Sequence, residues 1–468
     1  MWNSQRIAEI LGAECLGDPN VPVFGCVIDS RQARGGEIFF ALVGEKVDGH
    51  DYIEVAWKNG ANLAIAEKTK MKDRTKLNVP EGKALILVES GLSAMQELAK
   101  AWRMELGVKV VAITGSNGKT TTKDMIATVL AQKYRVHKNK ENQNNELGVP
   151  MTLLNAPEKT EVLVIEMGMR GLGQIKALCD FVHPDTGVIT NIGTTHMELL
   201  GSQENIAKAK WELIEALPIR GMAILNGEDL WSVKKAEKDP HQQFFYGIEG
   251  RYHPLNIQGT NLEQTGTLGT QFEIAAQAEH AKAYLPLPGE HNVLDALSAL
   301  AVGKVYGISL QEGCQGLAEL ELSKMRLELH PGIHGSMLLS DVYNANPTSM
   351  QASLKVLSQR SSQATLAILG EMYELGEASA SGHNVVGQAV AQLGITEIIT
   401  VGTLAEEIAQ GALESGMAPD RVHICSDRES AISQAKLILS SLGNETWVLI
   451  KASRGMKMEK VTEALQIS

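Results

Sequence analysis

The segment Thr114–Thr121, with the sequence Thr-Gly-Ser-Asn-Gly-Lys-Thr-Thr, has the residue types that bind nucleotide phosphates. It lies between a mostly apolar run at 108–113, which predicts a buried strand, and a run that predicts a helix. Glycines in such a turn let backbone N–H groups close on phosphate oxygens, and the helix N-terminus adds positive charge. Lys119 is placed to reach the β- and γ-phosphates, and the Thr120 hydroxyl to hold Mg²⁺. Only two residues separate the glycines, where the common phosphate-binding loop has four, but the Gly-Lys-Thr-Thr ending favours nucleotide binding over a turn that binds nothing.

Two more polar residues follow predicted strands. Glu166 ends the apolar run 162–166, where nucleotide-hydrolysing folds place a metal ligand, although an acidic residue at a strand end need have no such role. His196 closes the segment 191–196 after another strand, and a neutral imidazole there would bind a metal ion. Taken alone, an isolated histidine is more often a hydrogen-bonded loop residue.

Two lysines of the predicted helix 203–217 point to nearly opposite faces. Lys208 shares its face with the acidic residues Glu204, Glu212 and Glu215, which indicates a solvated, ion-paired side chain. Lys210 falls in line with the apolar residues Ile206, Leu213 and Leu217. A lysine that points inward is costly unless it is paired, neutralised or modified, so Lys210 is a candidate site residue. The alternative is a lysine that snorkels at the helix edge.

The whole chain has the composition of a cytoplasmic protein with several domains. Its 468 residues exceed what one core usually holds, so two to four domains are expected. A net charge of -12 argues against a nucleic-acid-binding surface. The five cysteines are scattered, which favours reduced thiols over disulfides or zinc sites. The N-terminus is too polar for a signal peptide, and no apolar run approaches the ~20 residues that span a bilayer.

Strand and helix signals alternate along three blocks and predict an α/β protein with three domains, at 1–105, 106–321 and 322–468. The first block ends in a predicted helix at 92–105, and the second contains a stretch at 250–281 that indicates an antiparallel excursion. Strands are predicted at 21–24, 38–41, 63–66 and 84–88, then at 108–114, 162–166, 186–190 and 223–225, and finally at 336–339, 364–369, 397–401, 422–424 and 447–450. Ligands of such mostly parallel sheets bind at the carboxyl ends of strands.

In the third block, polar loops again follow predicted strands. Arg326 opens the block and could swing onto a phosphate. The segment Asp341–Pro347 is a candidate ribose or substrate loop, and Gly370–Gly376 and Lys451–Lys457 follow other strands. Each alone is typical of an ordinary strand-to-helix loop, but their shared sheet edge predicts a cleft.

With these motifs, the chain resembles the Mur ligases, the ATP-dependent family that builds the peptidoglycan stem peptide. The resemblance covers essentially the whole length, and the short Gly-x-x-Gly-Lys-Thr loop is the family's own form. The motifs that carry it are 29–31, 36–42, 48–52, 114–121, 142–150, 190–196, 207–210, 289–292, 341–347, 370–376 and 453–459.

The resemblance implies an ADP-forming, peptide-bond-forming ligase that uses ATP, two Mg²⁺ ions and a carbamylated Lys210. The implied substrates are UDP-N-acetylmuramoyl-tripeptide and D-alanyl-D-alanine, joined through an acyl phosphate, because the motifs 142–150, 343–347 and 453–458 favour this acceptor. The alternatives are a sibling ligase that adds a single amino acid and a ligase similar to folylpolyglutamate synthase. A non-catalytic nucleotide-binding regulator would not need Glu166, His196 and Lys210 together. The third residue of the tripeptide, lysine or diaminopimelate, stays open.

The resemblance also implies the parts of the fold and their partners. A small N-terminal α/β domain binds the UDP-substrate, a central P-loop domain with a mostly parallel sheet binds ATP, and a Rossmann-like C-terminal domain closes over ATP and the dipeptide. The protein is expected to be a cytoplasmic monomer that binds small molecules, with no nucleic acid or membrane partner.

Individual roles are implied residue by residue. Four residues are implied to hold metal: Thr120, Glu166, His196 and Lys210. These four, except Thr120, are implied to be catalytic together with Lys119 and Arg326. ATP is implied to contact Gly115, Ser116, Asn117, Gly118, Lys119, Thr120, Thr121, Asn292, Arg326 and Asp341. The other substrates are implied to contact Ser30, Arg31, Asp48, Gly49, His50, Asn144, Asn145, Asn344 and Asn346. Two departures from the family pattern are Asp295, where a second Asn is common, and Val342, where a small residue is common.

Overall fold

The computed structural model describes residues 2–72, 77–140, 143–321, 325–360, 363–443 and 445–467. Asn142, the first residue of one motif, and Leu322, the predicted start of the third domain, lie outside the described residues. The described strands form three large sheets of five, nine and six strands and one two-stranded pair. The protein is therefore an α/β structure, as predicted.

The N-terminal part contains the five-stranded sheet, ordered β2-β7-β6-β5-β4, and the small antiparallel pair of β1 and β3. Strands β4 to β7 run parallel, and β2 pairs antiparallel with β7. The elements are β1 (Trp2–Asn3), α1 (Ser4–Ile10), β2 (Cys15–Gly17), β3 (Pro22–Val23), β4 (Cys26–Val27), η1 (Ser30–Gln32), β5 (Ile38–Phe40), η2 (Gly49–Tyr52), α2 (Ile53–Lys58), β6 (Leu63–Glu67), α3 (Lys68–Met71), β7 (Ala84–Val88) and α4 (Gly91–Leu106).

Helix α4 connects this part to the central sheet, and both of its ends are encoded locally. The Ser90 side chain accepts a hydrogen bond from the Ser93 backbone N–H at the start, and Gly107 ends the helix in the left-handed region at φ 61°. The helix packs on α6 and α7 and shares one hydrophobic core with the sheets on either side.

The central nine-stranded sheet has the order β16-β15-β14-β13-β12-β11-β8-β10-β9. Strands β8 to β14 are parallel, and β15 and β16 add antiparallel pairs, so the predicted antiparallel excursion is confirmed. The elements are β8 (Lys109–Thr114), α5 (Lys119–Leu130), β9 (Val136–Lys138), α6 (Gly148–Leu154), β10 (Val162–Glu166), α7 (Gln174–Val182), β11 (Thr186–Ile189), α8 (Met197–Leu200), α9 (Gln203–Glu215), β12 (Met222–Asn226), α10 (Leu230–Ala236), β13 (Gln242–Gly247), β14 (Ile257–Thr265), β15 (Gly269–Ala276), β16 (Glu279–Leu285), α11 (Glu290–Val305) and α12 (Leu310–Ala318).

The C-terminal six-stranded sheet has the order β17-β18-β22-β19-β20-β21, with only β17 antiparallel. Such a parallel sheet with helices between its strands is Rossmann-like. The elements are β17 (Glu328–Pro331), η3 (Ile333–Gly335), β18 (Met337–Asp341), α13 (Pro347–Ser358), β19 (Thr365–Gly370), η4 (Gly376–Ala378), α14 (Ser379–Gln392), β20 (Glu397–Val401), α15 (Glu406–Glu414), η5 (Pro419–Arg421), β21 (Val422–Cys425), α16 (Arg428–Leu442), β22 (Trp447–Lys451), η6 (Arg454–Met456) and α17 (Glu459–Leu465).

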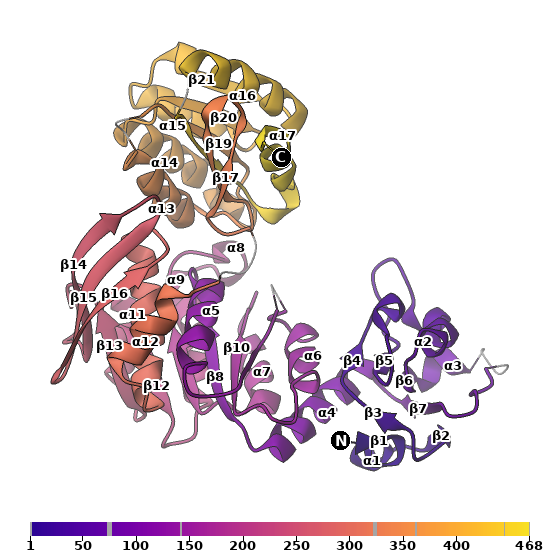
Figure 1. Cartoon of the computed structure of the whole chain (residues 1–468). Helices are drawn as coiled ribbons and strands as arrows, with labels where there is room; N and C mark the ends of the chain where they lie inside the picture. The colour runs from indigo at the N-terminus through magenta and orange to yellow at the C-terminus, as the bar shows by residue number, and fades with distance from the viewer. Residues whose placement is uncertain are drawn as a thin grey trace.

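The N-terminal and C-terminal parts lie on different sides of the central part. Figure 1 shows the C-terminal part, in orange to yellow, above the central part, and the N-terminal part, in indigo, to one side. Across the described ranges, no helix combines the length and apolar composition that a bilayer crossing requires.

Candidate active site

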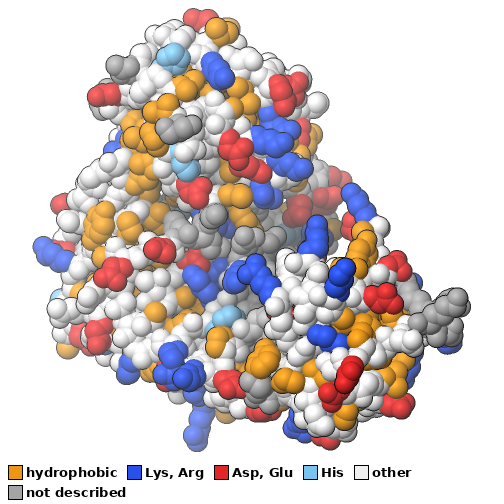
Figure 2. Space-filling model, turned by 45° about the vertical axis from the view of Figure 1, so that its right-hand side comes forward, with side chains coloured by type: hydrophobic (Ala, Val, Ile, Leu, Met, Phe, Trp, Pro, Cys, Tyr) orange, Lys and Arg blue, Asp and Glu red, His pale blue; other side chains and the backbone are white. Residues whose placement is uncertain are grey.

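A cleft of about 1160 Å³ lies between the central and C-terminal sheets. Its walls are loops that follow the carboxyl ends of strands, including β8, β10, β11, β18 and β22. Figure 2 shows the hollow where the parts of the chain meet, with Lys and Arg side chains around it. This is the edge at which parallel α/β sheets bind ligands.

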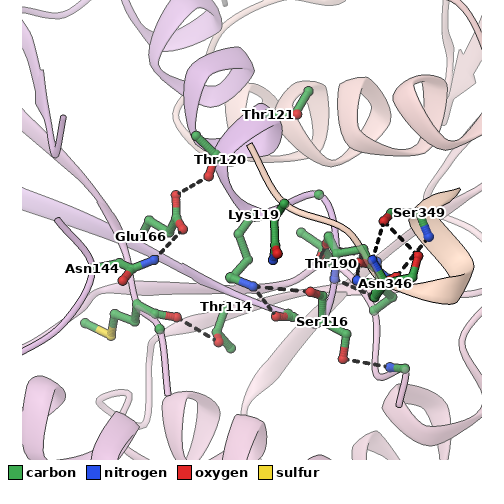
Figure 3. A pocket seen from close by; sticks show the side chains of 18 of the residues that line it. Thr114, Ser116, Lys119, Thr120, Thr121, Asn144, Glu166, Thr190, Asn346 and Ser349 are labelled. Atoms are coloured by element: carbon green, nitrogen blue, oxygen red, sulfur yellow. Dashed lines mark hydrogen bonds between the residues drawn. The ribbon is translucent and has the colours of Figure 1, made fainter. Parts of the chain in front are cut away.

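The turn between β8 and α5 forms the floor of the cleft. Gly118 precedes the helix at φ 80°, and a Cβ there would lie 2.5 Å from an oxygen of Asp295. A Cβ on Gly115 would lie 1.9 Å from the Thr190 hydroxyl, so both positions need glycine. The Lys119 ammonium donates to the carbonyls of Gly115 (2.8 Å) and Ser116 (3.3 Å), as Figure 3 shows. The Lys119 side chain thus folds back onto the backbone of its own Gly-rich turn.

The loop after β11 holds this turn in place. Asn191 accepts from the Asn117 backbone N–H at 3.0 Å and donates to the Asn117 carbonyl at 3.1 Å. The Thr190 hydroxyl donates to the same carbonyl at 2.6 Å. Asn191 therefore holds the backbone of the turn, a role that the sequence prediction did not assign. Its position at the end of a strand could have marked it as a site residue.

Glu166 lies beside Thr120 at the base of the cleft. Its two carboxylate oxygens accept from the Thr120 hydroxyl and from the Asn144 amide, each at 2.8 Å (Figure 3). Asn139 fixes the backbone by accepting from the Glu166 N–H at 2.9 Å and donating to its carbonyl at 3.0 Å. A hydroxyl and a carboxylate so close together are hard oxygen donors of the kind that Mg²⁺ prefers.

Lys210 and His196 face the same cleft. Lys210 is only 1% exposed, and Lys208 is exposed, so the two lysines point as the helix periodicity predicts. Burial, and then the positive charge of Lys119, hold the pKa of Lys210 well below its ordinary value. A lower pKa raises the share of the neutral amine, which is the form that reacts with CO₂.

His196 adopts a left-handed backbone conformation at φ 62°. Burial lowers its pKa to about 4, and the positive charges of Lys119, Lys210 and Arg170 add to this effect. Its Nδ1 lies 3.1 Å from a carboxylate oxygen of Glu374, in the loop Gly370–Gly376 of the C-terminal sheet. The imidazole is therefore neutral near pH 7, as a metal ligand must be.

Side chains of the C-terminal part reach across the cleft to the P-loop. Arg326 donates to the Thr120 hydroxyl at 2.8 Å, and its guanidinium lies over the Tyr343 ring, 4.3 Å from the centroid. The Asn346 amide donates to the Asn117 side-chain oxygen at 2.6 Å. Residues more than 200 positions apart thus meet at the turn between β8 and α5.

The Asp341 carboxylate is hydrogen-bonded to other side chains of the C-terminal part. One of its carboxylate oxygens accepts from the Lys451 ammonium and from the Ser353 hydroxyl, the latter at 2.8 Å. The Lys451 ammonium also donates to the Asn344 carbonyl at 3.0 Å. Lys451 is a buried cleft residue that the sequence prediction named only as part of a loop, because its strand looked purely apolar.

Helix α11 supplies another wall of the cleft. The Asn292 amide donates to the Pro288 carbonyl at 2.6 Å, and both Asn292 and Asp295 are buried. Burial raises the pKa of the Asp295 carboxyl to about 8. Val342, the other departure from the family pattern, packs in the C-terminal hydrophobic core.

The predicted site residues of the central and C-terminal parts all border this cleft. They are Gly115, Ser116, Asn117, Gly118, Lys119, Thr120, Thr121, Asn144, Asn145, Glu166, His196, Lys210, Asn292, Arg326, Asp341, Asn344 and Asn346.

The five predicted residues of the N-terminal part do not border the cleft: Ser30, Arg31, Asp48, Gly49 and His50. The His50 ring is buried, with Nδ1 2.6 Å from Asp48 and Nε2 accepting from the Glu67 backbone N–H at 2.9 Å. Both ring nitrogens therefore serve the local fold. The Arg31 guanidinium is exposed and pairs with Asp29.

Comparison with known proteins identifies similar domains along almost the whole chain. Three family descriptions match: Mur ligase family, catalytic domain, at residues 23–103; Mur ligase middle domain, at 113–303; and Mur ligase, glutamate ligase domain, at 325–454. The chain is 36% identical over 454 residues to the UDP-N-acetylmuramoyl-tripeptide--D-alanyl-D-alanine ligase of Bacillus subtilis, covering 95% of this chain and 93% of that protein.

Two solved structures share the fold. One is the UDP-N-acetylmuramoylalanyl-D-glutamyl-2,6-diaminopimelate--D-alanyl-D-alanyl ligase from Acinetobacter baumannii, with a TM-score of 0.82, 28% identity and coverage of 99% and 97% of the two chains. The other is the MurF ligase from Thermotoga maritima in complex with ADP, with a TM-score of 0.79, 28% identity and coverage of 95% and 97%.

Proposed function

The chain belongs to the Mur ligase family, and we propose that it joins D-alanyl-D-alanine to UDP-N-acetylmuramoyl-tripeptide with hydrolysis of ATP to ADP, in peptidoglycan precursor synthesis. The observation that carries the proposal is the convergence of Lys119, Glu166, Lys210 and Arg326 in a single cleft. The names of its relatives favour the dipeptide acceptor over a single amino acid or a folate substrate.

The reaction must first activate a carboxylate, because a carboxylate oxygen is a poor leaving group. Transfer of the γ-phosphoryl group of ATP to the tripeptide carboxylate gives an acyl phosphate and ADP. The amine of the dipeptide then attacks the acyl carbon, loses a proton, and expels inorganic phosphate. Lys119 and Arg326 offset the charge of the transferring phosphoryl group, since both cations lie at the phosphate-binding turn.

Two Mg²⁺ sites fit the side chains of the cleft. We propose that Thr120 and Glu166 hold one ion and that His196 and Lys210 hold the other, Lys210 as a carbamate. The neutral amine attacks the carbon of CO₂ and releases a proton, which replaces a buried amine by an anion with two oxygen donors. Support comes from the hard oxygens at Thr120 and Glu166 and from the burial of the Lys210 amine. When bound, Mg²⁺ neutralises charge on the phosphates.

The three predicted domains divide the substrates between them in this proposal. Residues 1–105 bind the uridine end through Ser30 and Arg31, with Asp48, Gly49 and His50 near them; Asn144 and Asn145 contact the UDP-sugar. In 106–321, Asn292 faces adenine. In 322–468, Asp341 faces ribose, and Asn344, Asn346 and the Gly370–Gly376 loop face the dipeptide. The enzyme acts as a monomer in the cytoplasm, where ATP and UDP-linked precursors are found.

An acceptor panel tests the proposal. With ATP and a UDP-tripeptide, D-alanyl-D-alanine should be joined in one step, with one ADP released per peptide bond. Free amino acids should give no product, and Lys119→Ala, which removes the P-loop cation, should release no ADP while remaining folded. Use of free amino acids with no use of the dipeptide would identify a sibling ligase instead.

A further inference from the structure

Two opposite charges that border the cleft have no role in the proposed function. Arg170 follows β10, four residues after Glu166, and Glu146 precedes α6. Both side chains are exposed and border the cleft. Within the described ranges, neither the guanidinium of Arg170 nor the carboxylate of Glu146 has a hydrogen-bond or ion-pair partner.

The backbones that carry these two charges are held firmly. The Gly168 N–H donates to the Asn144 carbonyl at 2.8 Å, which joins the two loops side by side. The Gln174 side chain accepts from the Arg170 backbone N–H at 2.6 Å, and Gln96 donates to the Glu146 carbonyl at 3.2 Å. The fold thus fixes the backbone positions of Arg170 and Glu146, and their charged groups are available to bind a ligand.

Arg170 borders the same cleft as Lys119, His196 and Lys210, the groups around which the proposed function places phosphoryl transfer. In the proposed reaction, the third residue of the tripeptide carries the reacting carboxylate, so the side chain of that residue begins two bonds away from the reacting carbon. That side chain must therefore extend into the part of the cleft near these groups.

We propose that Arg170 and Glu146 recognise a third residue whose side chain ends in both a carboxylate and an ammonium group, as diaminopimelate does, in preference to lysine. The proposal rests on the proposed function and names the substrate class of the same site. A relative of the same fold is named for a diaminopimelate substrate.

The two charges divide the recognition between them. Glu146 meets the terminal ammonium, which lysine and diaminopimelate share. Arg170 meets the terminal carboxylate, which only diaminopimelate has, and a guanidinium binds a carboxylate through two parallel hydrogen bonds. A site that offers both charges to a lysine side chain leaves the guanidinium facing an ammonium, so it also disfavours the wrong substrate.

Steady-state kinetics with two UDP-tripeptides, one ending in lysine and one in diaminopimelate, test the proposal. The unmodified protein should prefer the diaminopimelate substrate. Arg170→Met should lower kcat/KM for that substrate by about tenfold or more, as loss of a charge-assisted hydrogen bond does, and affect the lysine substrate much less. Glu146→Gln should lower both. Arg220→Met, a change at an exposed arginine at the opposite end of the central sheet, is the matched control.

Calorimetric titration of each UDP-tripeptide without ATP gives a second readout that needs no turnover. The dissociation constant of the diaminopimelate substrate should rise in Arg170→Met, and the loss of preference should match the kinetic loss. Equal losses for both substrates would overturn the proposal, because Arg170 would then bind a group common to both. Absence of turnover with any tripeptide and D-alanyl-D-alanine would refute the proposed function, and the titration would still decide this inference.

Discussion

Lys210 shows how far a single side chain can be understood from helix periodicity. Its position in line with Ile206 and Leu213 predicts an inward side chain, and in the structure it is buried in the cleft wall while Lys208 is exposed. The chemistry of Lys210 is a separate matter, because a buried lysine can stay as a neutral amine or become a carbamate.

Replacement of Lys210 by alanine tests the carbamate. Lys210→Ala should lose most activity, because the proposed anion between His196 and the phosphates is gone. Short carboxylic acids should partly restore activity by placing a carboxylate in the vacated space. Lys208→Ala should be nearly silent in the same assay. Equal effects of the two variants would contradict the helix-face argument.

The raised pKa of Asp295 predicts that the stability of the fold depends on pH. Its pKa is raised to about 8 by burial, so the carboxyl is neutral in the folded protein over a range where it is ionised in the unfolded chain. The folded state therefore holds one more proton between about pH 4 and 8, and stability falls as pH rises through that window. The charged and polar groups that face Asp295 include Arg326 and Tyr246.

Asp295→Asn should remove this pH dependence. Its gain in free energy of unfolding over the unmodified protein should grow by up to about 1.4 kcal/mol per pH unit across the window and level off above pH 8. Denaturant unfolding at pH 5 and pH 8 measures the difference. Asp420→Asn, at an exposed position, should show little change at either pH. A gain independent of pH would mean that Asp295 is ionised in the fold.

At the scale of elements, the structure contains the strands that were predicted from runs of buried β-branched or leucine residues. The predicted 84–88, 162–166 and 397–401 strands match β7, β10 and β20. The prediction missed the short strands β1, β2, β4, β9 and β17, and also β13, a six-residue strand inside the central sheet. Strands β2, β4, β9 and β17 lie at sheet edges, and such strands owe their structure to pairing with a neighbour, which no local pattern encodes.

The parts of the site that one continuous motif forms could be predicted from sequence. The parts formed by loops far apart in the sequence could be predicted less well. The turn 114–121 could be placed from sequence, because a strand, glycines and a helix follow one another directly. The contacts of Asn191 with Asn117 and of Lys451 with Asp341 join segments from different strands. Their pairing depends on strand order, which the sequence of one chain does not reveal.

The turn itself gives a prediction at this scale. Gly118→Ala places a Cβ at φ 80° and 2.5 Å from Asp295, so it should cost about 1–2 kcal/mol of stability through backbone strain and also weaken ADP binding. Gly107→Ala has a similar strain at φ 61° with open space around it, and it should lower stability without changing the ADP dissociation constant. Thermal unfolding and ADP titration of both variants separate strain from the local clash.

At the scale of the whole molecule, the C-terminal and N-terminal parts differ in how they lie relative to the cleft. The C-terminal part already contacts the turn between β8 and α5 through Arg326 and Asn346. The N-terminal loop with Ser30 and Arg31 does not border the cleft. In the proposed function, one substrate has its uridine end at that loop and its reacting carboxylate near Lys119, so we expect the N-terminal part to move toward the cleft when this substrate binds.

Small-angle scattering tests this movement. The radius of gyration should fall when the UDP-tripeptide and a nucleotide are both bound, toward the roughly 23 Å expected of a compact chain of 468 residues. ADP alone should change it less, because the two walls of its site are already in contact. The UDP-tripeptide should cause most of the compaction, since it is the ligand that links the N-terminal part to the cleft. An unchanged radius with both ligands at saturation, in a sample of full activity, would show that catalysis does not need the N-terminal part to close.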